Sequence, residues 1–256
     1  MNICSMIFHL NHKQIRSWIV SLMNNGIVPK TINRKISSLR SFYKYLLSRK
    51  EININPLTKI AGLKTPSILP KFVDEKDLHK LSDTTLFSSD FEGARDKLII
   101  ELFYNTGIRL SELVGIKDSD INTEVASLKV RGKGNKERII PLHNSLLSEM
   151  QDYKIMREEK FGTNVNTFFL TDKGKAIYQK LVYRKVKFYL SMVTTSDKKS
   201  PHVLRHSFAT HLMNHGAELN AVKELLGHSS LAATQVYTHN TIQKLKDIHK
   251  QAHPKS

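Results

Sequence analysis

Apolar side chains recur at helical intervals along the first fifty residues of the chain. Between residues 12 and 25 they are spaced three and four apart, which predicts an amphipathic helix that Gly26 ends. The same spacing predicts a second helix from Thr31, the expected N-cap, to about Ser48. The N-terminal part of the chain is therefore expected to be all-α.

The periodic pattern then breaks at three prolines, Pro56, Pro66 and Pro70. Residues 60–72 follow no clear period. Proline restricts its own backbone and that of the residue before it, so this stretch is the best candidate for a linker. We place the boundary there, between a domain of residues 1–65 and a domain of residues 66–256.

A period of two replaces the helical period between residues 125 and 142. Ala126, Leu128 and Val130 alternate with polar residues there, and Gly-Lys-Gly-Asn follows, which predicts a β-hairpin. Further helices are predicted at about residues 90–105, 144–158, 176–192, 202–214, 218–226 and 240–252. The fold is therefore expected to be mainly α with a small antiparallel β-sheet, an α+β fold.

The charge of the chain is strongly positive and unevenly distributed. The 256 residues include 40 Lys and Arg against 23 Asp and Glu, which gives a formal net charge of +17. Residues 1–65 hold eleven Lys and Arg and one acidic residue, Glu51. An excess this one-sided indicates a polyanionic partner. The candidate contacts to phosphates of such a partner lie on the polar face of the second predicted helix and are Arg34, Lys35, Arg40 and Lys44.

Cysteine content and hydropathy exclude several classes of protein. The single cysteine, Cys4, allows neither an intrachain disulfide nor a cysteine-rich zinc site. Residues 1–10 lack the charged and apolar parts of a signal peptide, and no apolar run approaches the length of a membrane span. A soluble cytoplasmic protein without a membrane partner is expected.

The segment Pro-His-Val-Leu-Arg-His-Ser-Phe-Ala-Thr-His-Leu, residues 201–212, places chemistry on a helix. Leu204, Phe208 and Leu212 form its buried seam, and His202 and Arg205, three residues apart, are neighbours beside that seam. The alternative is a metal site built from His202, His206 and His211. One helix cannot bring these three side chains together, because His211 falls on the seam side, so His211 is interpreted as a core histidine.

Three further residues are ambiguous when each is taken alone. Arg109 could be a helix-capping partner of Glu112, and Tyr237 could be a packing residue. His228 follows Gly227, which suits the left-handed end of a helix. The His228 side chain is therefore expected at a junction between helices, where it can be held at the rim of a site.

Together these residues are similar to the motifs of the tyrosine recombinase (phage integrase) family, and most similar to its Xer-type members. The resemblance covers nearly all of residues 70–256 and includes the step of 24 residues from Arg109 to Lys133 and the step of nine from His228 to Tyr237. It implies a helical core-binding domain followed by a catalytic domain. The catalytic residues that it implies are Arg109, Lys133, His202, Arg205, His228 and Tyr237.

The resemblance also implies a reaction. Tyr237 would attack a DNA phosphorus to give a 3′-phosphotyrosine and a free 5′-hydroxyl, with His202 as the base and Lys133 as the acid that protonates the departing oxygen. Arg109 and Arg205 would neutralise the charge on the phosphate, and His228 would add a hydrogen bond. The scheme needs no metal and no nucleotide cofactor.

The expected partners follow from the same resemblance. They are double-stranded DNA, a homotetramer or heterotetramer on two duplexes that exchanges the helix at 240–252, and an accessory DNA translocase. Relatives begin with one more helix than this chain, so the first helix is expected to be missing, which predicts a less stable N-terminal domain and puts full recombination in doubt more than cleavage. Chromosome dimer resolution and mobile-element integration stay open. The alternatives are a catalytically idle DNA-binding protein and a topoisomerase of the same chemical type.

Overall fold

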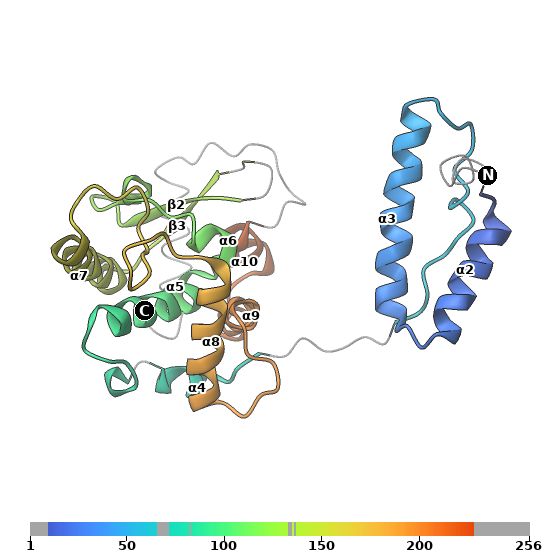
Figure 1. Cartoon of the computed structure of the whole chain (residues 1–256). Helices are drawn as coiled ribbons and strands as arrows, with labels where there is room; N and C mark the ends of the chain where they lie inside the picture. Colours follow the sequence, from blue (N-terminus) through green and yellow to red (C-terminus); the bar gives the residue numbers. More distant parts are fainter. Residues whose placement is uncertain (1–9, 66–71, 82, 133–134, 136, 228–256) are drawn as a thin grey trace. The chain divides into compact units, whose positions relative to one another are not determined.

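The computed structural model describes residues 10–65, 72–81, 83–132, 135 and 137–227. The chain divides into two compact units, Met1–Leu69 and Pro70–Ser256, and each has its own hydrophobic core (Figure 1). Within the described ranges, no helix is both long enough and apolar enough to cross a membrane.

Within its described residues, the first unit contains two helices, α2 (His12–Asn24) and α3 (Pro29–Ser48). Asn11 caps α2 through a capping box with Gln14. The segment after α3 is tied back to that helix, because the Asn33 side chain donates to Leu63 O at 2.9 Å and accepts from Leu63 N at 2.8 Å. The core between the helices and this segment consists of Ile15, Ile19, Ile32, Ile36, Tyr43, Leu46, Leu57 and Ile60.

The predicted N-cap of the second helix is wrong by three residues. Helix α3 begins at Pro29, with Val28 as its N-cap, and Thr31 lies inside its first turn. Proline fits the first helical position because the N–H that it lacks would have no partner there. The expectation that a first helix is missing concerns the residues before α2, of which 1–9 lie outside the described part.

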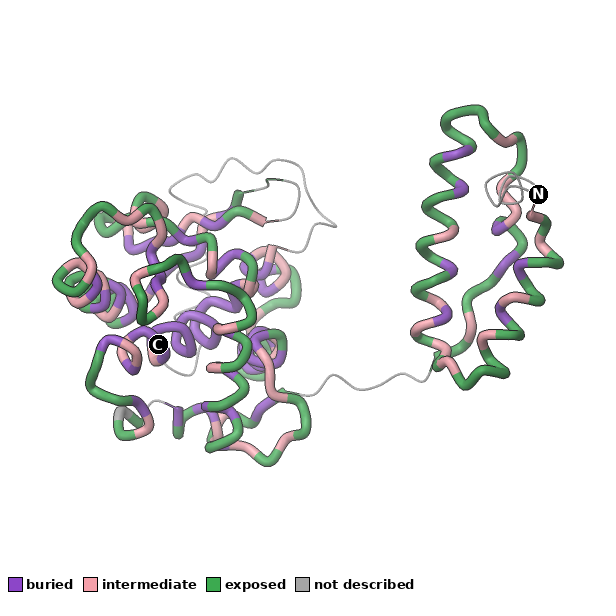
Figure 2. Tube along the Cα trace, in the orientation of Figure 1, coloured by how far each residue is buried: buried purple, intermediate pink, exposed green. Residues whose placement is uncertain are grey.

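Helix α5 (Phe91–Thr106) is the centre of the second unit. Three helices pack against it, α7 (Asn144–Phe161), α8 (Gln179–Val193) and α9 (Pro201–Asn214). Thirteen of its sixteen residues are buried, as Figure 2 shows along the length of the helix. A helix that is covered on all sides needs apolar residues around its whole circumference, so it has no single polar face.

A three-stranded antiparallel sheet lies in the same unit, in the order β1 (Ile121–Asn122), β2 (Ser127–Arg131) and β3 (Glu137–Pro141). Strands β2 and β3 form the predicted hairpin, with Val130 opposite Arg138. The expected small antiparallel sheet and mainly helical fold are thus confirmed.

The last described helix, α10 (Leu219–Leu226), packs on α9 through a small separate core that includes Phe208, Leu212 and Leu225. The short elements that the sequence did not predict are α4 (Glu75–Lys80), η1 (Thr84–Leu86), α6 (Leu110–Leu113), η2 (Asp118–Asp120) and β1. The predicted helix at 240–252 lies outside the described residues.

Gly107 fixes the turn from α5 into α6. Its φ is +58°, in the left-handed region, and a Cβ built on it would lie 2.6 Å from Phe208 Cδ1 and 2.8 Å from Leu226 Cδ2. Only glycine therefore allows α9 and α10 to approach the end of α5 this closely.

We predict that Gly107→Ala lowers the free energy of unfolding by about 2 to 4 kcal/mol, because it adds left-handed strain and an overpacked contact together. Gly216→Ala is the matched control, since Gly216 has a φ of +87° and no atom within 4 Å of the added Cβ. Urea unfolding measures the free energy of unfolding of both variants. Equal losses of this free energy would show that the packing around Gly107 does not contribute.

Candidate active site

The candidate site lies at the C-terminal end of α10. Three consecutive backbone carbonyl oxygens there each accept a hydrogen bond from a different arginine. The pairs are Arg138 Nε to Leu225 O at 3.2 Å, Arg205 Nη2 to Leu226 O at 2.7 Å and Arg109 Nη2 to Gly227 O at 2.9 Å. The last carbonyls of a helix have no partner inside it and form the negative end of its dipole, so this end attracts cations.

The three arginines come from three separate elements. Arg109 is the N-cap of α6, two residues after the left-handed turn at Gly107. Arg205 lies on α9, and Arg138 lies on strand β3. Gly227 ends α10 in the left-handed conformation, with φ +64°, which turns its carbonyl toward Arg109.

One buried carboxylate, that of Glu112, joins two of these arginines. Its Oε1 accepts from Arg109 Nη1 at 2.8 Å and from Arg138 Nη1 at 2.5 Å, and its Oε2 accepts from Arg138 Nη2 at 3.0 Å. Burial acts to raise the pKa of Glu112, but the hydrogen bonds and positive charges of Arg138 and Arg109 outweigh it and hold the pKa below its ordinary value. Glu112 is therefore ionised at neutral pH.

Three guanidinium groups and one carboxylate leave this group of side chains with two excess positive charges. Burial, together with the charges of Arg109 and Arg138, lowers the pKa of Arg205 to about 9, which still leaves it protonated at neutral pH. Arg205 also donates through Nη1 to Gly107 O. Arg109 is more open, with 36% of its side chain exposed. An anion that approaches from the Arg109 side would relieve the repulsion, as a phosphodiester would.

The structure places the predicted histidines on both sides of α9. The seam residues Leu204, Phe208 and Leu212 are buried, as predicted. His202 is exposed, one turn before Arg205. His211 is buried on the opposite side, where its Nδ1 lies 3.2 Å from Tyr104 Oη, so the interpretation as a core histidine is confirmed.

The other predicted catalytic residues, Lys133, His228 and Tyr237, lie outside the described residues. The described part therefore brings together Arg109 and Arg205, with His202 on the same helix as Arg205. His228 is the residue after Gly227, whose carbonyl Arg109 binds.

Sequence reasoning missed Arg138 and the shared role of Glu112. The pairing of Glu112 with Arg109 was one of the predicted alternatives and is present, but the second arginine was not predicted. The sequence did contain an indication that Arg138 is buried. Arg138 is two residues from Ile140, so the two side chains share the buried face of β3. An arginine at an inward position of a strand needs a buried acceptor.

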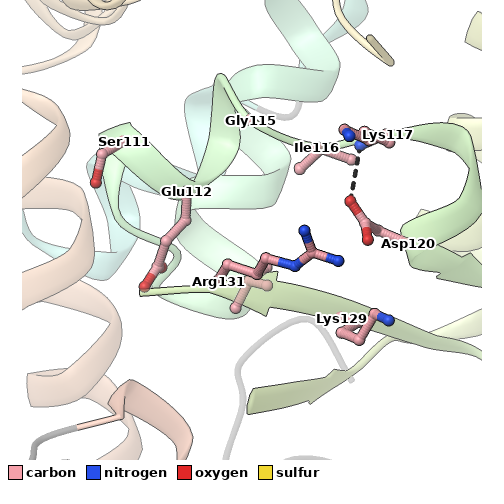
Figure 3. Close-up of a pocket in the computed structure, with 9 residues that line it drawn as sticks. Ser111, Glu112, Gly115, Ile116, Lys117, Asp120, Lys129 and Arg131 are labelled. Carbon is pink, nitrogen blue, oxygen red and sulfur yellow. Dashed lines mark hydrogen bonds between the residues drawn. The ribbon is translucent and has the colours of Figure 1, made fainter. Parts of the chain in front are cut away.

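A small pocket adjoins Glu112 between the segment Ser111–Asp120 and strand β2 (Figure 3). Lys117 N donates to Asp120 Oδ2 at 3.0 Å within it, and Lys129 and Arg131 line its β2 side. Its volume of about 60 Å³ is far below that of a cofactor pocket, so this hollow is suited to a phosphate oxygen or a water rather than a small molecule.

These features define a class of protein, an α+β protein in which arginines from three elements form a positively charged group at one helix end. The model of the phage integrase family matches residues 71–244, and that of the phage integrase N-terminal SAM-like domain matches residues 4–50. The chain belongs to the phage integrase family. It is an enzyme of the tyrosine recombinase type, a DNA strand transferase of site-specific recombination.

Individual relatives agree with this assignment. The chain is 37% identical over 263 residues to "Tyrosine recombinase XerC" of Chlorobaculum tepidum, covering 94% of this chain and 78% of that protein. It is 39% identical to the protein of the same name from Thermodesulfovibrio yellowstonii, covering 94% and 82%. Among solved structures it is similar to the XerH site-specific recombinase bound to palindromic difH substrate, with a TM-score of 0.72, 25% identity and coverage of 93% and 71%.

We predict that Glu112→Gln lowers the free energy of unfolding at pH 7 by about 3 to 5 kcal/mol, because it leaves the buried guanidinium group of Arg138 and the partly exposed one of Arg109 without their carboxylate. The folded-state pKa of Glu112 is lowered, so its contribution is present above the unfolded pKa and is lost as the pH falls through the folded pKa. Urea unfolding should therefore show a difference between wild type and variant that narrows from pH 7 to about pH 3. A difference that stays constant with pH would show that the charge of Glu112 is not responsible.

Proposed function

We propose that the chain cleaves and rejoins DNA through a covalent 3′-phosphotyrosine at Tyr237. The observation that carries this proposal is the arrangement of Arg109 and Arg205, which come from different elements and are held side by side at the end of α10 with excess positive charge. A guanidinium stays charged at neutral pH and can bind two phosphate oxygens at once. The family assignment supplies the nucleophile.

The proposed chemistry transfers one phosphoryl group between two oxygens. The Tyr237 oxygen bonds to phosphorus as its proton passes to His202, and the bond from phosphorus to the 5′-oxygen breaks. Lys133 gives a proton to that oxygen, while His228 donates a hydrogen bond to the phosphate. Attack by another 5′-hydroxyl reverses the step, so the number of phosphoester bonds is conserved and neither metal nor nucleotide is needed.

The proposed assembly is a tetramer on two DNA duplexes, made of four copies of this chain or of two related chains, with exchange of the helix predicted at 240–252. Support comes from the XerH relative, whose structure is a post-cleavage complex with its difH substrate. We propose chromosome dimer resolution, with an accessory DNA translocase, rather than mobile-element integration, because the chain is similar to proteins named "Tyrosine recombinase XerC". We expect the enzyme to act in the cytoplasm, where such DNA lies.

We predict that the wild-type chain forms a covalent adduct with nicked DNA in the presence of a metal chelator, and that Tyr237→Phe does not. The nick beside the candidate recombination site lets the cleaved strand diffuse away, so the phosphotyrosine accumulates instead of being resealed. A denaturing gel measures the adduct. An adduct formed by Tyr237→Phe would show that another residue is the nucleophile, and the absence of any wild-type adduct would favour the idle DNA-binding alternative.

The first unit is proposed to bind the DNA backbone. Arg34, Lys35, Arg40 and Lys44 are all exposed on α3. Arg40 also donates from Nη2 to Ile60 O at 2.8 Å, so it holds the segment after α3 in addition to any contact with DNA. The other three have side chains that are available for phosphates.

We predict that Arg34→Ala combined with Lys44→Ala reduces the slope of log affinity against log salt by about 2, since each lost phosphate contact removes about 0.9. Lys80→Ala combined with Lys154→Ala is the matched control, because these lysines already lie beside Asp77 and Asp118. Fluorescence anisotropy on duplex DNA between about 50 and 200 mM salt measures both slopes. An unchanged slope in the first variant would remove these residues from the interface.

A further inference from the structure

We propose that Arg138 is a positioning residue of the recombinase, which aligns Arg109 by holding Glu112 and the end of α10 at once. The inference rests on the proposed function. The proposed function assigns roles to residues that contact the phosphate. Arg138, in contrast, is buried, with 6% exposed, and is assigned no contact with the phosphate.

The contacts of Arg138 use all three nitrogens of its guanidinium group. Nη1 and Nη2 form a fork on the two oxygens of Glu112, at 2.5 and 3.0 Å, and Nε donates to Leu225 O at 3.2 Å. Its stem also packs under the end of α10, because a Cβ added to Gly227 would come 2.8 Å from Arg138 Cδ. A planar fork of this kind fixes both direction and distance, which the single ammonium of a lysine cannot do.

Each of these contacts leads to a catalytic element. Glu112 accepts from both the backbone N–H and Nη1 of Arg109, so its position sets that of the Arg109 guanidinium. Leu225 and Gly227 form the end of the helix from which His228 continues. Arg138 itself lies on β3, five positions after Lys133 in the sequence. One side chain thus links Arg109, through Glu112, to the end of α10.

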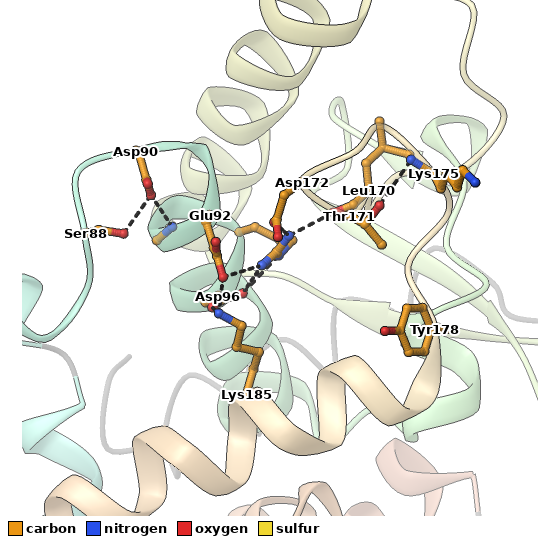
Figure 4. A network of polar contacts seen from close by, with 12 residues as sticks. Ser88, Asp90, Glu92, Asp96, Leu170, Thr171, Asp172, Lys175, Tyr178 and Lys185 are labelled. Carbon is orange, nitrogen blue, oxygen red and sulfur yellow. Dashed lines mark hydrogen bonds and ion pairs between the residues drawn. The ribbon is translucent and has the colours of Figure 1, made fainter.

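A buried arginine of similar surroundings lies elsewhere in the unit and serves as a control. Arg95, on α5, is fully buried, and its Nε and Nη2 donate to Asp96 Oδ1 at 2.9 and 2.8 Å while Nη1 donates to Leu170 O at 3.3 Å. Figure 4 shows this network, in which Lys185 also binds Asp96. Twelve residues of helix separate Arg95 from Gly107, about 18 Å along α5.

Arg138→Lys and Arg95→Lys therefore each disrupt a buried network of arginine hydrogen bonds. The network of Arg138 lies beside the site, and that of Arg95 lies far from it. The measurements are the single-turnover rate of adduct formation on the nicked DNA, the affinity for that DNA, and urea unfolding. Arg138→Lys is expected to slow adduct formation by about 100-fold, the cost of a misplacement near 1 Å, with DNA affinity changed less than about threefold. Arg95→Lys is expected to change the rate by less than about threefold even where it lowers stability.

Equal rate losses in the two variants would overturn the inference, because they would assign Arg138 a role in stability alone. If Arg138→Lys does not fold, Arg138→Gln replaces it, since it removes the buried cation while keeping a donor near Leu225 O. The Gln variant is expected to lose at least as much rate, and a rate within about threefold of wild type would overturn the inference.

A neutral substrate separates positioning of Arg109 from other effects. A methylphosphonate at the cleaved position carries no charge for a guanidinium to neutralise, so the deficit of Arg138→Lys should shrink to less than about tenfold. A deficit that stays near 100-fold on this DNA would show that Arg138 does not act through Arg109. Failure of the proposed function is recognised separately, by the lack of a wild-type adduct or by an adduct that survives Tyr237→Phe.

Discussion

The described part of the candidate active site depends on two sets of acceptors. The end of α10 accepts hydrogen bonds from three guanidinium groups, and the Glu112 carboxylate accepts from two of them. Like charges this close repel strongly in a buried environment, where solvent screens them little. The Glu112 carboxylate and the three carbonyls at the end of α10 offset that repulsion. The turn at Gly107, the packing of α10 on α9 and the inward face of β3 all serve to bring these groups to the same place.

Backbone carbonyls and the Glu112 carboxylate have different effects on the positive charge of the arginines that they bind. Arg205 donates only to backbone carbonyls among its described hydrogen bonds, those of Gly107 and Leu226, which orient the guanidinium without cancelling its charge. Arg138, in contrast, is neutralised by a carboxylate fork. The positive field is therefore concentrated on Arg205 and the partly exposed Arg109. Dipoles and charges fixed before the substrate arrives are the main source of electrostatic catalysis, because they need no rearrangement during the reaction.

Sequence patterns predicted the parts of this structure that depend on local spacing. The long amphipathic helices and the β2–β3 hairpin have clear periods, whereas α6 and β1 are too short to show one. Helix α5 was predicted from apolar residues at helical spacing and from its end near Gly107, but that pattern did not show that the helix is buried all round. The pairing of Glu112 with Arg138 joins residues 26 apart on different elements, so it follows from tertiary packing and not from any local pattern.

The geometry of Arg109 indicates how a phosphate can bind without dismantling the site. The described side-chain contacts of Arg109 are one hydrogen bond from Nη1 to Glu112 and one from Nη2 to Gly227 O. A guanidinium has five N–H groups, so three are not used in these two bonds and can face an incoming anion. The phosphate would then be added to an arginine that is already held at two of its nitrogens. Because that orientation is fixed in advance, binding of a phosphate there would cost little side-chain entropy, and the Gly227 carbonyl would keep its partner.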